Sequence, residues 1–382
     1  MLAMTHNVGR AILGVALITG MTVAMALGIG TAQAQEEIAP TQQALADYIS
    51  AGLDPAPDGR QPRAIVDVGG SAGRPTSVAS DPRGEGPEMS AYLPAFAYGL
   101  THPDAAPPGA NRWDCVPSPR YPRPVVLLHG SWLNAYDSFA YLAPRLARAG
   151  YCVFAVNFGR SGLLDGGGVG PLLPGRYGVG PIEDSSRQVR EFVDRVLAAT
   201  GARKVDIVAH SQGGTVANHY LKFEAGASNV GNLVSLGSTH HGTSLLGIAT
   251  LGRTINNLGV DILGFSEPVV GIANVQQAVG SPFYATLNAR GDTVPGVAYT
   301  SIGSRYDQIT NPYHWTFLQA GPGATVDNVT LQDGCERDLS DHLTMMYSPR
   351  AVSIVLRALD PIGHPALRCS FNPWLIGGGG GL

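Results

Sequence analysis

The sequence carries little charge and has no basic excess. Of its 382 residues only 14% are Asp, Glu, Lys or Arg, and the formal net charge is -4. No cluster of Lys and Arg marks a face that could bind phosphates, which argues against nucleic-acid binding. With 44% hydrophobic residues, 50 glycines and 28 prolines, the composition predicts a globular protein with many turns and a weakly charged surface.

Long apolar runs are also scarce, since only residues 11–30 form a stretch about long enough to span a bilayer. Arg10 precedes the run, and the small residues of an Ala-Gln-Ala site follow it at 32–34. This is the pattern of a cleaved export signal. We therefore expect residues 1–34 to be a signal peptide and the protein to be secreted. An uncleaved membrane anchor is the alternative interpretation.

The texture of the sequence changes near residue 124. Residues 35–123 are dense in Pro, Gly, Asp and Ser, with one helix-like stretch at 42–49 and no sustained strand alternation, and we interpret them as an N-terminal extension wrapping the domain. From there to 370, short apolar runs alternate with amphipathic segments, which is typical of β-α-β units. The sequence thus predicts an α/β domain with a mostly parallel sheet and helices on both faces, followed by a flexible Gly-rich tail at 371–382.

The elements of this domain can be placed from their apolar patterns. Strands are expected at 125–128, 152–158, 205–209, 233–236, 297–302 and 324–331. Helices are expected at 138–149, 182–197, 215–223 and 350–359, and a Gly-rich loop at 159–180.

The strongest local motif is A-H-S-Q-G-G at 209–214, placed between the apolar run 205–208 and a helical pattern. A nucleophilic serine on a tight strand-to-helix turn has strained dihedrals and needs small residues two before and two after it. Ala209 and Gly213 meet that need around Ser211, although alanine replaces the usual first glycine. We interpret the motif as a nucleophile elbow, with an ordinary turn of small residues as the alternative.

A second motif, His129-Gly130, closes the first predicted strand. Acyl transfer needs two preorganised N–H donors that face the developing oxyanion. In the α/β-hydrolase fold one donor belongs to the residue after the nucleophile and the other to this loop. The backbone N–H groups of Ser131 and Gln212 are therefore the candidate oxyanion hole. His129 is expected to hold the loop and take no proton, and a plain turn histidine is the alternative.

The same fold orders its catalytic residues as serine, acid and histidine, so the base must follow Ser211. His342 is the candidate base, because it lies in the polar loop 338–344 between the last predicted strand and the last helix. His314 precedes that strand and His364 follows the helix, and a structural role fits both better.

The candidate acid is Asp307, which comes just after the predicted strand 297–302, where a carboxylate could orient the imidazole. Asp333 is the runner-up. Asp292 precedes that strand and would lie at the wrong end of the sheet, and Asp341 is too close in sequence to reach back to the ring of His342. Together these residues predict an acyl-enzyme mechanism on carboxylic esters.

No metal or cofactor is expected. The neighbouring His240 and His241 point apart in any regular backbone, so a structural role is favoured over a metal site. The four cysteines lack C-x-x-C spacing, and in an exported protein they predict two disulfides. Three pairings are possible. We favour Cys115 with Cys152 and Cys335 with Cys369, because each pair brackets a local stretch and leaves the catalytic loops without crosslinks.

The segment 243–291 is too long for a simple connection between strands. It is also unusually apolar, with residues such as Leu258, Ile262 and Phe265. We expect a cap-like insertion whose inner face forms an acyl-binding groove above Ser211. An extra buried helix pair without substrate contact is the alternative.

Several motifs together resemble a known family. They are Pro124–Gly130, Gly150–Phe154, Val208–Gly214, Gly303–Pro312 and Asp341-His342. In order and spacing these are similar to the secreted triacylglycerol lipases and esterases of actinobacteria, the class 2 lipases, over about residues 115–369. The resemblance implies that Ser211, Asp307 and His342 occupy that family's triad positions and that Cys115 and Cys152 form its bridge. The segment before Asn111 matches no family known to us.

The expected function is hydrolysis of small-molecule or lipid esters by a monomer that contacts lipid interfaces transiently. Two alternatives stay open. An acyltransferase on the same fold would carry the same triad and pass the acyl group to an alcohol, and acceptor competition in water would separate the two activities. A non-catalytic binding protein would keep the fold but would fail to react with a fluorophosphonate at Ser211.

Overall fold

The computed structural model of the chain describes residues 77–162, 165, 174–243 and 271–374. All of them belong to one of the two units into which the chain divides, Ala46–Leu382. The predicted signal peptide, the helix predicted at 42–49, and Leu258, Ile262 and Phe265 of the insertion lie outside the described residues.

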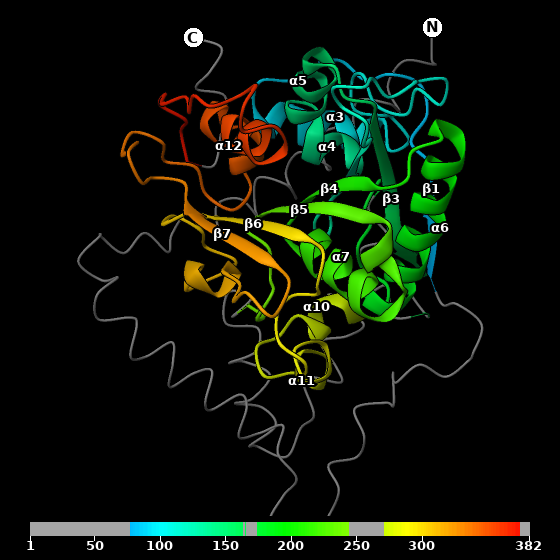
Figure 1. Ribbon diagram of the computed structural model, residues 1–382, viewed down its shortest axis with the longest axis vertical. Coiled ribbons are helices and arrows are strands. Elements are labelled where there is room, and N and C mark those ends of the chain that lie inside the picture. Colours follow the sequence, from blue (N-terminus) through cyan, green and yellow to red (C-terminus); the bar gives the residue numbers. More distant parts are fainter. Residues whose placement is uncertain (1–76, 163–164, 166–173, 244–270, 375–382) are drawn as a thin grey trace, which may run out of the picture. The chain divides into compact units, whose positions relative to one another are not determined.

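Seven strands form one sheet in the order β1-β3-β2-β4-β5-β6-β7 (Figure 1). Every neighbouring pair from β3 to β7 is parallel, and β1 joins β3 antiparallel. This confirms the α/β class with a mostly parallel sheet. The strands are β1 (Ser77–Ser80), β2 (Val125–Leu128), β3 (Val153–Ser161), β4 (Val205–His210), β5 (Val230–Leu236), β6 (Ala298–Gly303) and β7 (Thr325–Thr330).

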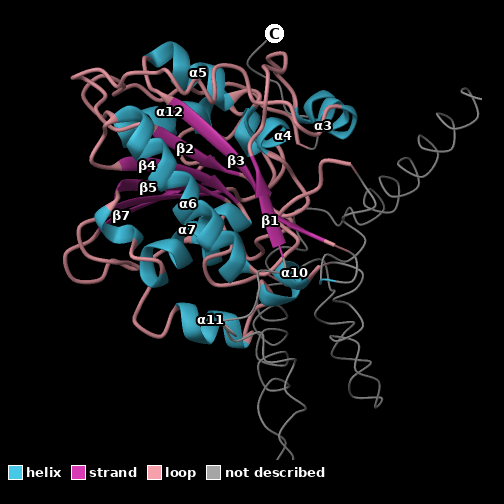
Figure 2. Ribbon diagram, turned by 90° about the vertical axis from the view of Figure 1, so that its right-hand side faces the viewer, coloured by secondary structure: helices cyan, strands magenta, loops and turns pink. Residues whose placement is uncertain are grey.

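Helices pack against both faces of the sheet (Figures 1 and 2). One apolar cluster joins the sheet to α3 (Tyr92–Thr101), α4 (Ala135–Phe139), α5 (Leu142–Ala149) and α12 (Pro349–Leu359). The other joins it to α6 (Ile182–Thr200), α7 (Gln212–Phe223), α10 (Ile272–Gln276) and α11 (Pro282–Leu287). Short 3-10 helices occur at η3 (Gly226–Ser228), η5 (Tyr313–Thr316) and η6 (Met345–Tyr347).

The continuous apolar run of β2 reflects this double covering. Val125 and Leu127 belong to the first cluster, whereas Val126 and Leu128 belong to the second. Because successive side chains of a strand point to opposite faces, a parallel strand buried on both sides needs apolar residues throughout.

One helix prediction was wrong in its extent. The segment predicted as a single helix at 138–149 contains two, because Pro144 has no N–H and is accommodated only in the first turn of α5. The preceding helix α4 begins earlier than predicted, since Asn134 and Asp137 form a reciprocal capping box.

The sequence also missed two elements before residue 124. Strand β1 pairs with the edge of β3, but it has four residues, of which only Ser77 is buried, so it leaves no alternation to detect. Helix α3 buries Tyr92, Ala95 and Gly99 within a segment that had been interpreted only by its Pro and Gly content. The remaining predicted helices and strands occur with small shifts at their ends.

The strand order reverses between β2 and β4, because β3 lies on one side of β2 and β4 on the other. In open parallel sheets, loops leave the carboxyl ends of the strands in opposite directions at such a point and open a crevice there. The loops after β2 and β4 carry residues 129–131 and Ser211. The fold thus brings both candidate motifs to one edge of the sheet.

Candidate active site

Ser211 occupies a strained turn between β4 and α7. Its φ of 52° and ψ of -126° lie in a region that residues with a side chain rarely adopt. A Cβ on Gly213 would lie 2.3 Å from the carbonyl oxygen of Leu128, so a larger residue would push α7 away from β2. This is the local geometry that the elbow motif predicts.

Ser211, His342 and Asp307 lie together although far apart in sequence. The Oγ of Ser211 is 2.8 Å from Nε2 of His342, and Nδ1 of the same ring is 2.9 Å from Oδ2 of Asp307. The His342 and Asp307 side chains are only 3% and 1% exposed. Water therefore competes little for these hydrogen bonds.

The surroundings of Asp307 fix the direction of these bonds. Its Oδ1 accepts from the backbone N–H groups of Ile309 and Thr310 at 2.9 and 2.7 Å. An ionised carboxylate only accepts, so the ring proton of His342 belongs on Nδ1. That tautomer leaves the Nε2 lone pair facing the hydroxyl of Ser211, which is the arrangement needed for a general base.

His210, the residue before the serine, contacts the backbone of the base. Its Nε2 lies 2.8 Å from the carbonyl oxygen of His342, to which it donates. The ring is fully buried, and burial together with the nearby His342 lowers the pKa of His210 well below its usual value. A neutral His210 thus holds the loop of His342 in place.

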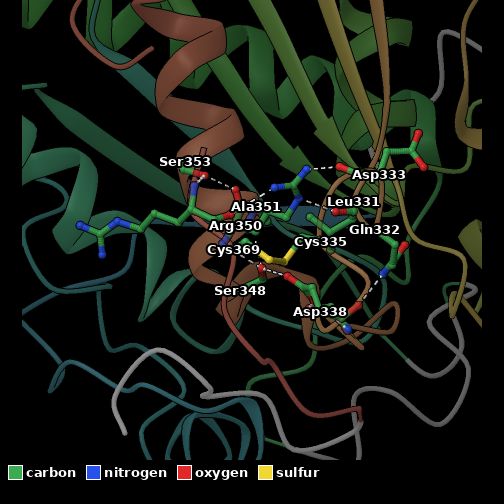
Figure 3. Close-up of a disulfide and its surroundings, with 12 residues drawn as sticks. Leu331, Gln332, Asp333, Cys335, Asp338, Ser348, Arg350, Ala351, Ser353 and Cys369 are labelled. Carbon is green, nitrogen blue, oxygen red and sulfur yellow. Dashed lines mark hydrogen bonds between the residues drawn. A yellow bond between two sulfur atoms is a disulfide. The ribbon is translucent and has the colours of Figure 1, made fainter. Parts of the chain in front are cut away.

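The loop that carries His342 is further held by residues around the second disulfide (Figure 3). Cys335 is bonded to Cys369. The Arg350 guanidinium donates to the carbonyl oxygens of Leu331 and Asp333, and Asp338 accepts from Ser340 and Ser348. These contacts fix both ends of the segment between β7 and α12.

The loop after β2 lies directly against the serine. A Cβ on Gly130 would be 3.0 Å from Cβ of Ser211, so only glycine fits there. His129 donates from Nδ1 to the Gly130 carbonyl at 2.8 Å and accepts at Nε2 from the N–H of Phe158 at 3.1 Å. Burial lowers the pKa of His129 to about 3. The ring is therefore neutral and holds the loop, as predicted.

The candidate oxyanion residues flank this contact. Ser131 follows Gly130, and Gln212 follows Ser211 as the first residue of α7. A Cβ on Gly178 would lie 3.2 Å from Cα of Ser131 and 2.7 Å from the side-chain oxygen of Gln212. The loop containing Gly178 therefore packs both residues closely together.

The rejected acids have other partners. Asp333 is paired with Arg305 at 2.6 Å, and its side chain is 63% exposed. Asp292 accepts from His241 and from the backbone of Gln319, and Asp341 accepts from the backbone of Leu343 and Thr344. Of these, none contacts the ring of His342 through a hydrogen bond in the described part of the chain.

The remaining histidines lie apart from the serine. His240 is buried against Ser235, at 3.0 Å from its hydroxyl, and burial lowers the pKa of His240 to about 3. His314 lies in η5, and His364 follows α12, where its N–H donates to Asp360. Within the described ranges, no group of three His, Cys, Asp or Glu residues could hold a metal ion.

The cysteines are paired as Cys115–Cys152 and Cys335–Cys369, the pairing favoured from the sequence. No helix among the described residues is long and apolar enough to cross a membrane.

Sequence reasoning missed the roles of His210 and Gln277. His210 stands within the elbow motif, but its partner is a backbone carbonyl 132 residues away, and no side-chain pattern reports such a contact. Gln277 donates to the hydroxyl of Ser131 at 2.9 Å from 146 residues further along the chain, and nothing in the sequence around it signals that contact.

Comparison with known proteins supports this geometry. The alpha/beta hydrolase fold family matches residues 123–251. A triacylglycerol lipase of Burkholderia plantarii is 28% identical over 60% of this chain and 56% of its own length, and one of Pseudarthrobacter phenanthrenivorans is 27% identical over 55% and 58%. The chain thus spans slightly more than half the length of these relatives.

Among solved structures, lipase B of Aspergillus fumigatus matches 74% of this chain and 64% of its own chain, at 19% identity and a TM-score of 0.49. The family match over residues 123–251 agrees with the strand order of the sheet, in which β3 to β7 are parallel. On these two findings, the chain is an α/β hydrolase.

Proposed function

We propose that this protein is a secreted serine hydrolase that cleaves carboxylic esters of lipids through Ser211. The observation that carries the proposal is the chain of hydrogen bonds from the Ser211 hydroxyl through His342 to Asp307. The similarity of more than half of the chain to two bacterial triacylglycerol lipases supports esters as the substrate class.

The mechanism follows from the positions of these groups. Ser211 Oγ attacks the ester carbonyl while Nε2 of His342 takes its proton, and Asp307 stabilises the resulting imidazolium. The backbone N–H groups of Ser131 and Gln212 stabilise the oxyanion. The imidazolium then protonates the leaving alcohol. Water, activated by the same histidine, cleaves the acyl-enzyme and restores Ser211.

Secretion is part of the proposal. It is supported by the export-signal pattern of residues 1–34 and by two disulfides, which persist in oxidising compartments. Mass spectrometry of the protein from culture medium tests it. A mature N-terminus near Gln35 is the expected result, and a chain retained in the membrane with residues 1–34 attached contradicts it.

The activity is tested with p-nitrophenyl esters of two to sixteen carbons and with emulsified triglyceride. Wild-type protein should hydrolyse the esters, and Ser211→Ala should lose at least about a hundredfold in kcat while keeping its circular dichroism spectrum. A fluorophosphonate probe should label the wild type and leave Ser211→Ala unlabelled. Activity that survives in Ser211→Ala would assign the nucleophile elsewhere.

An acyltransferase would give a different result in the same assay. With an added alcohol acceptor in water, a hydrolase releases mainly free acid, whereas a transferase releases mainly the new ester. Dominant ester formation would replace hydrolysis as the function while leaving the role of Ser211 intact.

A further inference from the structure

The hydroxyl of Ser131 is held by a residue outside the predicted site. Nε2 of Gln277 donates to Ser131 Oγ at 2.9 Å. Gln277 is the residue at the C-terminal end of α10 and is only 2% exposed. Helix α10 thereby contacts the loop that carries the candidate oxyanion donors.

The direction of this hydrogen bond is fixed by the other contacts of the amide. Nε2 of Gln277 also lies 3.1 Å from the carbonyl oxygen of Ala273, and Oε1 accepts from the hydroxyl of Thr239 at 2.8 Å. A carbonyl oxygen cannot donate, so the amide nitrogen must face Ala273 and therefore Ser131. Ser131 Oγ is thus the acceptor, and its own proton is left to donate elsewhere.

Gln277 is itself firmly placed. The Thr239 that donates to it is held by Thr215, whose hydroxyl lies 3.0 Å from the Thr239 carbonyl and 2.9 Å from its hydroxyl. All three residues are buried. A buried polar network whose members have partners keeps each side chain in one orientation.

The free proton of Ser131 lies beside the reacting serine. Ser131 follows Gly130, whose Cα is so close to Ser211 that an added Cβ would be 3.0 Å from the serine Cβ. No residue in the described ranges accepts the Ser131 hydroxyl proton. Its side chain is only half-buried, so an acceptor on a bound substrate can reach it.

We propose that the Ser131 hydroxyl is a third donor to the oxyanion, next to the backbone N–H groups of Ser131 and Gln212, and that Gln277 is the positioning residue that orients it. The inference rests on the proposed ester hydrolysis. As Ser211 attacks, negative charge develops on the carbonyl oxygen and the Ser131 O–H shortens its hydrogen bond to that oxygen. The proton stays on Ser131 throughout, so no bond to this residue forms or breaks.

Ser131→Ala tests the proposal, because it removes the hydroxyl and leaves the backbone N–H in place. With p-nitrophenyl butyrate, kcat should fall by about 10- to 100-fold while KM changes less than about threefold, since the lost bond acts mainly on the transition state. Ser131→Thr, which keeps a hydroxyl, should recover most of the lost rate.

A trifluoromethyl ketone gives a second measure, because its adduct with Ser211 carries the same oxyanion. Its inhibition constant should rise in Ser131→Ala by the same factor as kcat/KM falls. Gln277→Met should also lower kcat, and the double variant should be no slower than Ser131→Ala alone, because both changes remove one interaction.

Two results would overturn the inference. One is a Ser131→Ala enzyme with kcat within about threefold of wild type. The other is a loss that Ser131→Thr does not recover and that leaves the inhibitor constant unchanged, because a purely structural role would give it. Failure of the proposed function itself is distinct, since the wild-type protein would then hydrolyse no ester and Ser211 would take up no probe.

Discussion

Replacing Asp307 by asparagine should remove catalysis while preserving the fold. Asp307 Oδ1 accepts two backbone N–H groups, from Ile309 and Thr310. The only amide orientation that keeps both bonds places the asparagine oxygen there. Its NH2 group then occupies the position of Oδ2, which is 2.9 Å from Nδ1 of His342.

That NH2 group donates where the carboxylate accepted. The ring of His342 must then carry its proton on Nε2, which faces the Ser211 hydroxyl, so neither group can take the serine proton. We expect kcat to fall by about 10⁴-fold, equivalent to roughly 5.5 kcal/mol of transition-state stabilisation.

The assay is the initial rate with p-nitrophenyl butyrate at pH 8, with circular dichroism to verify folding. Asp333→Asn is the matched control, because its carboxylate is exposed and paired with Arg305, and its kcat should stay within about twofold of wild type. If Asp307→Asn keeps more than about a hundredth of the wild-type kcat, or if Asp333→Asn loses as much, the acid is assigned wrongly.

Three further predictions concern stability. Arg176 and Asp137 are paired at 3.0 Å with both side chains buried, so Arg176→Met should lower the free energy of unfolding by about 3 to 5 kcal/mol in urea titrations; a loss below about 1 kcal/mol contradicts this. Gly213→Ala should reduce both the melting temperature and kcat, because its Cβ would meet the Leu128 carbonyl at 2.3 Å; unchanged values of both would show that α7 can shift freely. Burial lowers the pKa of His219 to about 4, below the ordinary 6.5, so the unfolded state binds the proton first as pH falls. Between pH 7.5 and pH 5 the wild type should therefore lose about 2 kcal/mol of stability relative to His219→Gln, and parallel curves for the two proteins would refute the assignment.

The sequence by itself determined the residues that local chemistry constrains. The motif around Ser211 is legible because the strained turn tolerates only small neighbours, and β2 is legible because a strand covered on both faces must be apolar throughout. The order of acid and base along the chain then reduced the candidates to Asp307 and His342. These two assignments remain proposals until the variants are measured.

The tertiary structure decided what depends on distant segments. Strand β1 joins the sheet through backbone pairing with β3, and backbone pairing leaves little trace in four residues. The bond from His210 to the His342 carbonyl and the bond from Gln277 to Ser131 join segments more than a hundred residues apart. Neither partner has an unusual sequence neighbourhood, because such contacts are set by where the strands of the sheet end and which loops meet there.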